Sequence, residues 1–264
     1  MSAPEPGAPE PAAGADPVLL LCAHGSRSQP ARRATARVTE QVADLLPGTE
    51  VLETWVDVQT PDVAARCAEM AERPVVIVPL LLAAGYHVRH DLELAVRGRP
   101  HHVVAGALGP DPRLSALLGR RLAEAAGNVG AADGAAEHGP GEQPGDPVVL
   151  IAAGSSDERA VADVRAQAED LFRRLERPVE TGFVSAARPS AQEAVTAVRA
   201  RTGRPVEAAS FLLSPGQFHD RAAAAGAERT SAPLLGEDGA AEEILEIVLQ
   251  RWQEGLRLLA ARGR

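Results

Sequence analysis

The chain has 264 residues, 45% hydrophobic and 24% charged, a composition typical of globular proteins and long enough for about two domains. The net charge of -9 argues against a nucleic acid as partner, and no apolar run approaches the roughly 18 residues of a transmembrane helix. Residues 1–16 lack the basic and apolar regions of a secretory signal. They consist mainly of Pro, Ala, Gly and acidic residues, so we expect a disordered N-terminal lead. Cys22 and Cys67 show no CxxC spacing, which favours buried thiols in a reducing cytoplasm.

The first part of the chain alternates apolar runs of strand length with stretches of helical spacing. Strands are predicted at 18–23, 51–58, 74–82 and 101–108. Helices are predicted at 28–46, from Thr60 as N-cap with Pro61 at the first helical position, after 83–91, and at 111–126. The run 74–82 is the most apolar, which is typical of a central strand buried on both faces. This alternation predicts a parallel sheet covered by helices on both faces.

The second part of the chain repeats the first. Residues 127–146 are rich in Gly, Ala, Glu and Pro without periodicity, which indicates a flexible linker. Beyond it, three segments repeat earlier ones about 130 residues later: 147–156 repeats 17–26, 181–189 repeats 54–61, and 204–216 repeats 73–85. A last helix is predicted at 240–259. We therefore predict an α/β protein of two tandem flavodoxin-like units, 17–126 and 147–264, each a four-stranded parallel sheet flanked by helices.

Three polar residues of the first unit stand where predicted strands end: His24, Asp57 and His87. In a sheet of flavodoxin-like order 2-1-3-4, the strand that ends at His24 lies between the other two, so the three side chains would converge at one edge. Two imidazoles and a carboxylate suit a divalent first-row metal such as Fe, Co or Ni, or acid–base chemistry near neutral pH. The alternative is structural, because a histidine of intermediate burial can simply bond a backbone carbonyl in the core.

The second unit has lost these residues. Ala153 stands opposite His24, and Ser185 stands opposite Asp57. Opposite His87 is Phe218, or His219 if the loop slips by one residue. A site in each half is therefore disfavoured, and one centre in the first half is predicted.

Three segments carry a resemblance to a known family: AHGSR at 23–27, WVDVQTP at 55–61 and VPLLLAAGYHVRHDL at 78–92. With them the sequence resembles the sirohydrochlorin chelatases, the class II chelatases, in their long, internally duplicated form. The resemblance implies a catalytic chelatase half at 17–126 and a degenerate second half at 147–264. It also implies insertion of Fe²⁺ or Co²⁺ into sirohydrochlorin, in siroheme or cobalamin biosynthesis.

The same resemblance implies roles for individual residues. His24 and His87 would bind the incoming metal, and His24 is favoured as acceptor of the pyrrole protons. Asp57 stands where many members carry glutamate, which leaves open whether it is a ligand or a proton acceptor. The macrocycle would be bound by a larger set, with the two arginines and the serine facing its carboxylates: Gly25, Ser26, Arg27, Leu82, Ala83, Ala84, Gly85, Tyr86 and Arg89.

The resemblance also implies partners, and two rival functions are considered beside it. No cofactor is expected beyond the substrate metal, Fe²⁺, Co²⁺ or Ni²⁺. The expected partners are a sirohydrochlorin-type tetrapyrrole, the metal and, for transfer, enzymes of the tetrapyrrole pathway, in the cytoplasm without membrane or nucleic acid. One rival is a non-catalytic metal- or tetrapyrrole-binding protein. A hydrolase is disfavoured because the chain has no G-x-S-x-G elbow and Ala23, not arginine, precedes His24.

Overall fold

Two four-stranded, all-parallel sheets form the framework, in a computed structural model that describes residues 16–83, 85–127 and 145–262. The first sheet contains β1 (Val18–Ala23), β2 (Val51–Trp55), β3 (Val75–Pro79) and β4 (His102–Val104). The second contains β5 (Val148–Ala152), β6 (Val179–Phe183), β7 (Glu207–Phe211) and β8 (Arg229–Thr230). Their orders, β2-β1-β3-β4 and β6-β5-β7-β8, confirm the prediction of two flavodoxin-like units. The expected N-terminal lead and most of the expected linker lie outside the described residues.

The central strands are buried because their sequences are apolar on both faces. Every residue of β1 and β3 is buried, as predicted for strands covered by helices on both sides. The helices that provide this cover are α1 (Gln29–Leu45), α2 (Val63–Glu69), α3 (Tyr86–Val96), α4 (Pro112–Ala125), α5 (Glu158–Leu175), α6 (Ala191–Thr202), α7 (Gln217–Ala223) and α8 (Glu242–Arg262). None of the helices in the described ranges is long and apolar enough to cross a lipid bilayer.

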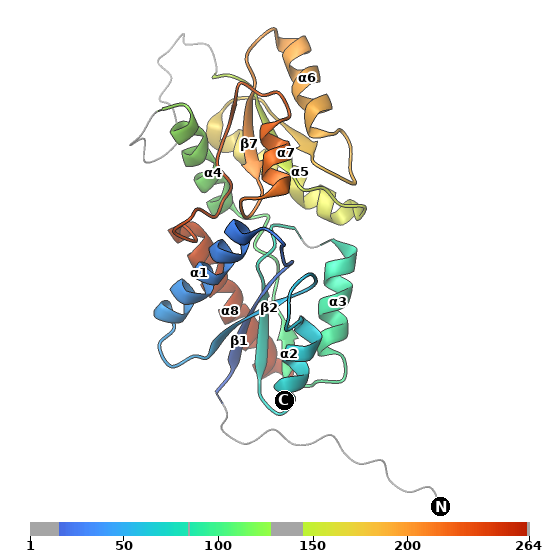
Figure 1. Ribbon diagram of the computed structural model, residues 1–264, viewed down its shortest axis with the longest axis vertical. Helices are drawn as coiled ribbons and strands as arrows, with labels where there is room; N and C mark the ends of the chain where they lie inside the picture. The colour runs from blue at the N-terminus through green and yellow to red at the C-terminus, as the bar shows by residue number, and fades with distance from the viewer. Residues whose placement is uncertain (1–15, 84, 128–144, 263–264) are drawn as a thin grey trace, which may run out of the picture.

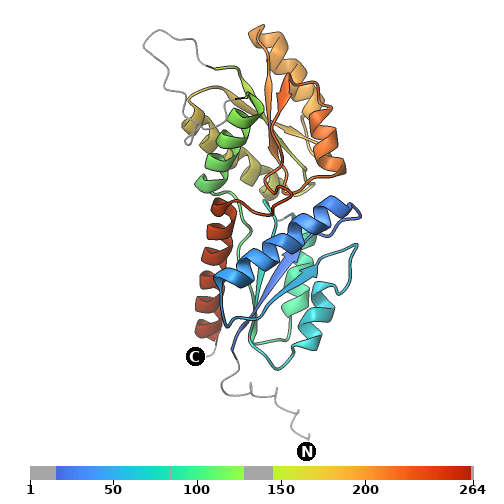
Figure 2. The same cartoon turned by 60° about the vertical axis from the view of Figure 1, so that its left-hand side comes forward.

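Two helices are exchanged between the units, which the sequence pattern did not indicate. Helix α4 packs against α5 and β7 of the second unit, whereas α8 packs against β3 and β4 of the first (Figures 1 and 2). Close contacts fix α8 there: a Cβ added at Gly255 would lie 2.1 Å from Val76 Cγ1, and Arg251 Nε donates to Ala107 O at 2.8 Å. The two units in space are therefore not separated simply at residues 127–146, because α4 belongs to the second unit and α8 to the first.

The loop after β2 differs from its prediction. The strand ends at Trp55 rather than at residue 58, and a cis peptide joins Thr60 to Pro61 ahead of the helix. The N-cap is Asp62, whose side chain accepts a backbone N–H of the first turn, so the prediction of Thr60 was wrong. The reason is that aspartate is a stronger N-cap than threonine. Strands β3 and β4 are likewise shorter than the predicted runs 74–82 and 101–108.

Candidate active site

The loops after β1 and β2 are joined by their backbones at the carboxyl edge of the first sheet. His24 O accepts the N–H of Asp57 at 3.0 Å. Gly25 has a φ of 98°, and a Cβ there would lie 1.9 Å from Asp57 O, so only glycine fits. The structure thus brings His24 and Asp57 together as predicted from strand order, with both side chains exposed.

A glutamine that the sequence reasoning did not single out completes this contact. The backbone N–H of Ser26 donates to Gln59 Oε1 at 2.9 Å, and the N–H of Ser28 donates to Ser26 Oγ at 3.1 Å. Asp57 Oδ1 accepts the N–H of Val58 at 2.7 Å. Gln59 lies within the segment WVDVQTP, so its only signal was membership of that motif. Both loops are therefore held in place by hydrogen bonds around His24.

The third predicted segment follows β3, across β1 from the β2 loop. Leu82 and Ala83 are half-buried against the core, and Gly85 is the N-cap of α3. Tyr86 and His87 are the first two residues of this helix, but their side chains, and all of Ala84, lie outside the described residues. Convergence of His87 with His24 and Asp57 therefore stays a prediction. Among the described side chains, no group of three or more His, Cys, Asp or Glu could hold a metal ion.

The two arginines of the predicted macrocycle site have different surroundings. Arg27 is exposed at the start of α1. Arg89, in the first turn of α3, has a guanidinium nitrogen 3.4 Å from Asp157 Oδ2 in the second unit. The binding of substrate carboxylates by both arginines stays a prediction, and in the structure Arg89 also forms an ion pair with an acid of the protein.

The two cysteines take no part in this site. Both are free and buried, as predicted. Burial raises the pKa of the Cys22 thiol to about 12 and that of the Cys67 thiol to about 11. Both thiols are therefore neutral near pH 7 and are not thiolate ligands.

The second unit keeps the backbone of the site but not its chemistry. A Cβ added at Gly154, whose φ is 89°, would lie 1.9 Å from Ser185 O, as at the first-unit loop. Because α7 begins at Gln217, one residue after its N-cap, Phe218 and not His219 matches the position of His87. His219 Nδ1 lies 3.0 Å from Ser210 Oγ, and burial lowers the pKa of this imidazole.

The carboxyl edges of the two sheets face each other. A Cβ added at Gly85 would lie 2.9 Å from Ser155 Oγ of the second unit. A second contact runs the other way, from Gly216 of the second unit to Ser28 of the first, where a Cβ added at Gly216 would lie 3.4 Å from the serine Oγ. The loops that carry His24 and the start of α3 therefore lie at the junction of the units (Figure 1).

The chain matches one family profile and several solved structures. The CbiX family profile matches residues 18–125 and 147–255. SirB from Bacillus subtilis with Fe³⁺ superposes with a TM-score of 0.64 at 21% identity, covering 90% of this chain and 95% of that one. SirB from Bacillus subtilis subspecies spizizenii in complex with cobalt gives a TM-score of 0.63 at 18% identity, with coverage of 91% and 95%.

A third solved structure has the same arrangement. CbiX, described as the terminal enzyme for biosynthesis of siroheme in denitrifying bacteria, gives a TM-score of 0.60 at 21% identity, covering 90% of this chain and 98% of that one. A comparison with curated protein sequences finds no match. At these identities the structural matches show the fold alone, over the nine-tenths of the chain that they cover.

Proposed function

Because the chain belongs to the CbiX family, we propose that it is a metal chelatase that inserts Fe²⁺ or Co²⁺ into sirohydrochlorin, in siroheme or cobalamin biosynthesis. One observation carries the proposal beyond family membership. The Gly25 contact locks the loop of His24 against that of Asp57, at the junction of the units and across β1 from the start of α3. This contact supports His24 as a base and Asp57 as a neighbouring carboxylate for a flat substrate bound between the units.

The chemistry requires two tasks of the protein. A divalent metal must be held and released to the ring nitrogens, and two pyrrole protons must leave as it enters. We assign the metal to His24 and His87, because neutral imidazole binds first-row metals, and assign the protons to His24. Asp57, exposed beside His24, would then stabilise the imidazolium that forms.

The macrocycle needs apolar walls and a few donors for its carboxylates. Half-buried Leu82 and Ala83 supply apolar surface, and Tyr86 follows them at the start of α3. Arg27 is exposed beside His24 and would bind a carboxylate. The buried thiols support a reducing compartment, and we place the reaction in the cytoplasm.

An anaerobic absorbance assay tests the function. Sirohydrochlorin is mixed with Fe²⁺, Co²⁺ or Ni²⁺, with and without enzyme, and metal insertion is followed by the spectral change. We expect catalysed conversion, with the ratio of rates identifying the preferred metal. Binding of the macrocycle without acceleration by any metal would instead indicate a non-catalytic binding protein.

A pair of histidine variants tests the site. His87→Ala should abolish insertion while the far-ultraviolet circular dichroism stays native. His219→Ala is the matched control, because this histidine contacts Ser210 in the degenerate unit, and it should insert metal at the wild-type rate. Equal activity of the two variants would place the centre elsewhere.

A further inference from the structure

We propose that Asp157 of the second unit is a positioning residue for the active site, acting through its ion pair with Arg89. The pair fixes the first turn of α3, which begins at Tyr86 and carries His87 as its second residue. This inference rests on the proposed function, since it concerns how His87 is held for metal insertion. The degenerate half, which has lost the site residues, would then still contribute to the active site of the first half.

The carboxylate of Asp157 is held on both sides. It is the N-cap of α5, with Oδ1 accepting the N–H of Arg159 at 3.0 Å, while Oδ2 lies 3.4 Å from the Arg89 guanidinium. Its own N–H donates to Ser155 Oγ at 3.0 Å. The side chain of Asp157 is 8% exposed and that of Arg89 is 35% exposed. Because the Asp157 carboxylate is largely withdrawn from water, its attraction to the Arg89 cation is screened less than that of an ion pair on the surface.

A second contact from the same loop flanks His87 on its other side. Gly85, the N-cap of α3, approaches Ser155 so closely that a Cβ would lie 2.9 Å from the serine Oγ. The loop from 155 to 157 therefore contacts α3 two residues before His87 and two residues after it. Together these contacts restrict both the start and the first turn of the helix.

The internal duplication shows that the ion pair is not simply part of the symmetric packing. Counted from the matching loops, Ser28 corresponds to Asp157, and Asp220 in α7 corresponds to Arg89. On that side Gly216 also lies against the facing loop, but at Ser28 rather than at the equivalent Ser26, and a Cβ there would lie 3.4 Å from the serine Oγ. A serine and an aspartate cannot form the ion pair. The charge pair thus exists where the helix carries His87 and not where it carries Phe218.

Two roles for Arg89 make opposite predictions about Asp157. If the pair positions α3, breaking it displaces His87, so kcat falls while KM changes little. If Asp157 merely competes with the macrocycle carboxylates for Arg89, removing its charge frees the guanidinium, so KM falls while kcat is unchanged. The first outcome is the one we expect.

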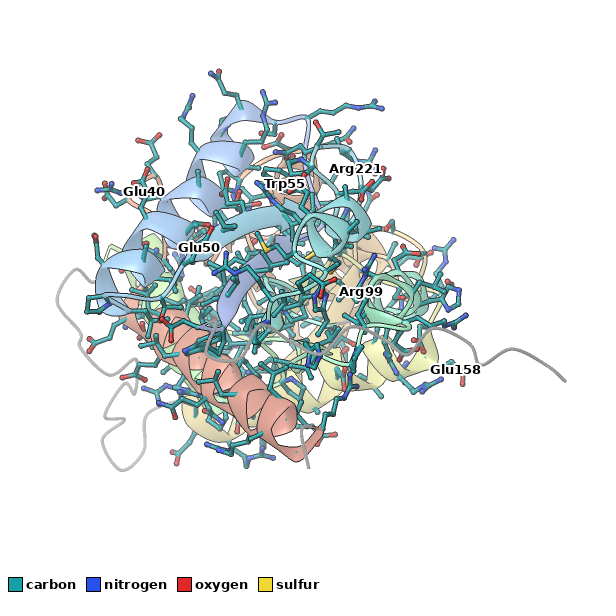
Figure 3. The ribbon with its side chains drawn as sticks, turned by 90° about the horizontal axis from the view of Figure 1, so that it is seen from below. Glu40, Glu50, Trp55, Arg99, Glu158 and Arg221 are labelled. Carbon is teal, nitrogen blue, oxygen red and sulfur yellow. The ribbon has the colours of Figure 1, made fainter. Side chains whose placement is uncertain are left out.

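Asp157→Asn is the informative variant, because asparagine caps helices as well as aspartate. It keeps the cap and removes the ion pair with Arg89, together with a looser 3.8 Å contact to the exposed Arg159. We expect kcat to fall about tenfold, the effect of a displacement well under 1 Å. Asp157→Glu keeps the charge and should recover part of kcat. Glu158→Gln is the matched control: it removes the same charge from the next residue, which projects outward from α5 (Figure 3), and should behave as wild type.

Hydrogen exchange of the resting protein provides a readout independent of activity. The amides of residues 89–92, which donate hydrogen bonds within α3, should exchange faster in Asp157→Asn than in wild type. Their exchange should be unchanged in Glu158→Gln. If wild type itself inserts no metal, the proposed function fails, and this exchange difference alone decides whether the pair holds α3. Unchanged exchange in Asp157→Asn, an unchanged kcat in an active enzyme, or a lowered KM with wild-type kcat would each overturn the inference.

Discussion

The contact between Gly25 and Asp57 offers the sharpest test of how the site is built. Gly25→Ala places a methyl group 1.9 Å from Asp57 O, and real Cβ atoms essentially never approach closer than 3.0 Å. The two loops must therefore separate by about 1 Å, a displacement that can cost about a hundredfold in rate. The substitution also forces a side chain into a φ of 98°, which costs on the order of 1–3 kcal/mol of stability.

The duplication supplies a control with the same strain. Gly154→Ala creates a Cβ at 1.9 Å from Ser185 O, at a φ of 89°. Both variants should therefore lose a similar unfolding free energy in urea, on the order of 1–3 kcal/mol. Gly25→Ala displaces His24 and Asp57 themselves, so it should lose about a hundredfold in kcat/KM for metal insertion. Gly154→Ala shifts only the neighbouring loop of Ser155 and Asp157 that contacts α3, so its loss should not exceed about tenfold.

The assay is done at a temperature where circular dichroism shows both variants folded. Comparable activity in the two variants would show that the rate follows global stability rather than the spacing of the two loops. A Gly25→Ala enzyme with wild-type kcat/KM would refute the reasoning outright.

Three further predictions concern the packing that supports the site. Gln167→Leu removes three hydrogen bonds: the one that Gln167 Oε1 accepts from the N–H of Asp111, and the two that Gln167 Nε2 donates to Asp111 O and Ser115 Oγ. It should lower the unfolding free energy by at least about 2 kcal/mol in urea titrations. Gly255→Ala forces a Cβ to 2.1 Å from Val76 Cγ1, so α8 should loosen and the urea midpoint fall, by about 1–3 kcal/mol in free energy. Burial raises the pKa of Asp111, but hydrogen bonds from Arg113 outweigh burial and hold it below 3.8. The ionised form therefore stabilises the fold above pH 3.8, and the stability gap between wild type and Asp111→Asn should shrink as pH falls below that value.

Local sequence signals predicted the strands and their order well. The run from Val18 to Ala23 became β1 with the expected bounds, because an uninterrupted apolar run can only be buried. The repeat predicted two copies of one unit. The pattern could not show which sheet each amphipathic helix covers, since an apolar face on α4 or α8 fits either sheet equally well. The exchange of these helices was therefore invisible in the sequence.

The candidate site was predictable where it depends on strand order and not where it depends on the facing unit. His24 and Asp57 were predicted at one edge because each follows a strand, and their backbones are indeed bonded. The pairing of Arg89 with Asp157 joins residues 68 positions apart on two different units. No local spacing encodes that contact, so Arg89 was interpreted only as a cation near the substrate.

The exchange of α4 and α8 has a consequence for how the chain folds during synthesis. The first sheet needs α8 to cover β3 and β4, and one of the bonds that holds it runs from Arg262 to His102 O, 160 residues earlier. The first unit therefore leaves the ribosome with an apolar sheet face uncovered. At that stage the second sheet, against which α4 packs, has not yet been synthesised. Domains usually fold in the order in which they are translated. Here the unit that carries the proposed catalytic residues is the one completed last, and its open apolar face stays exposed until α8 has been synthesised.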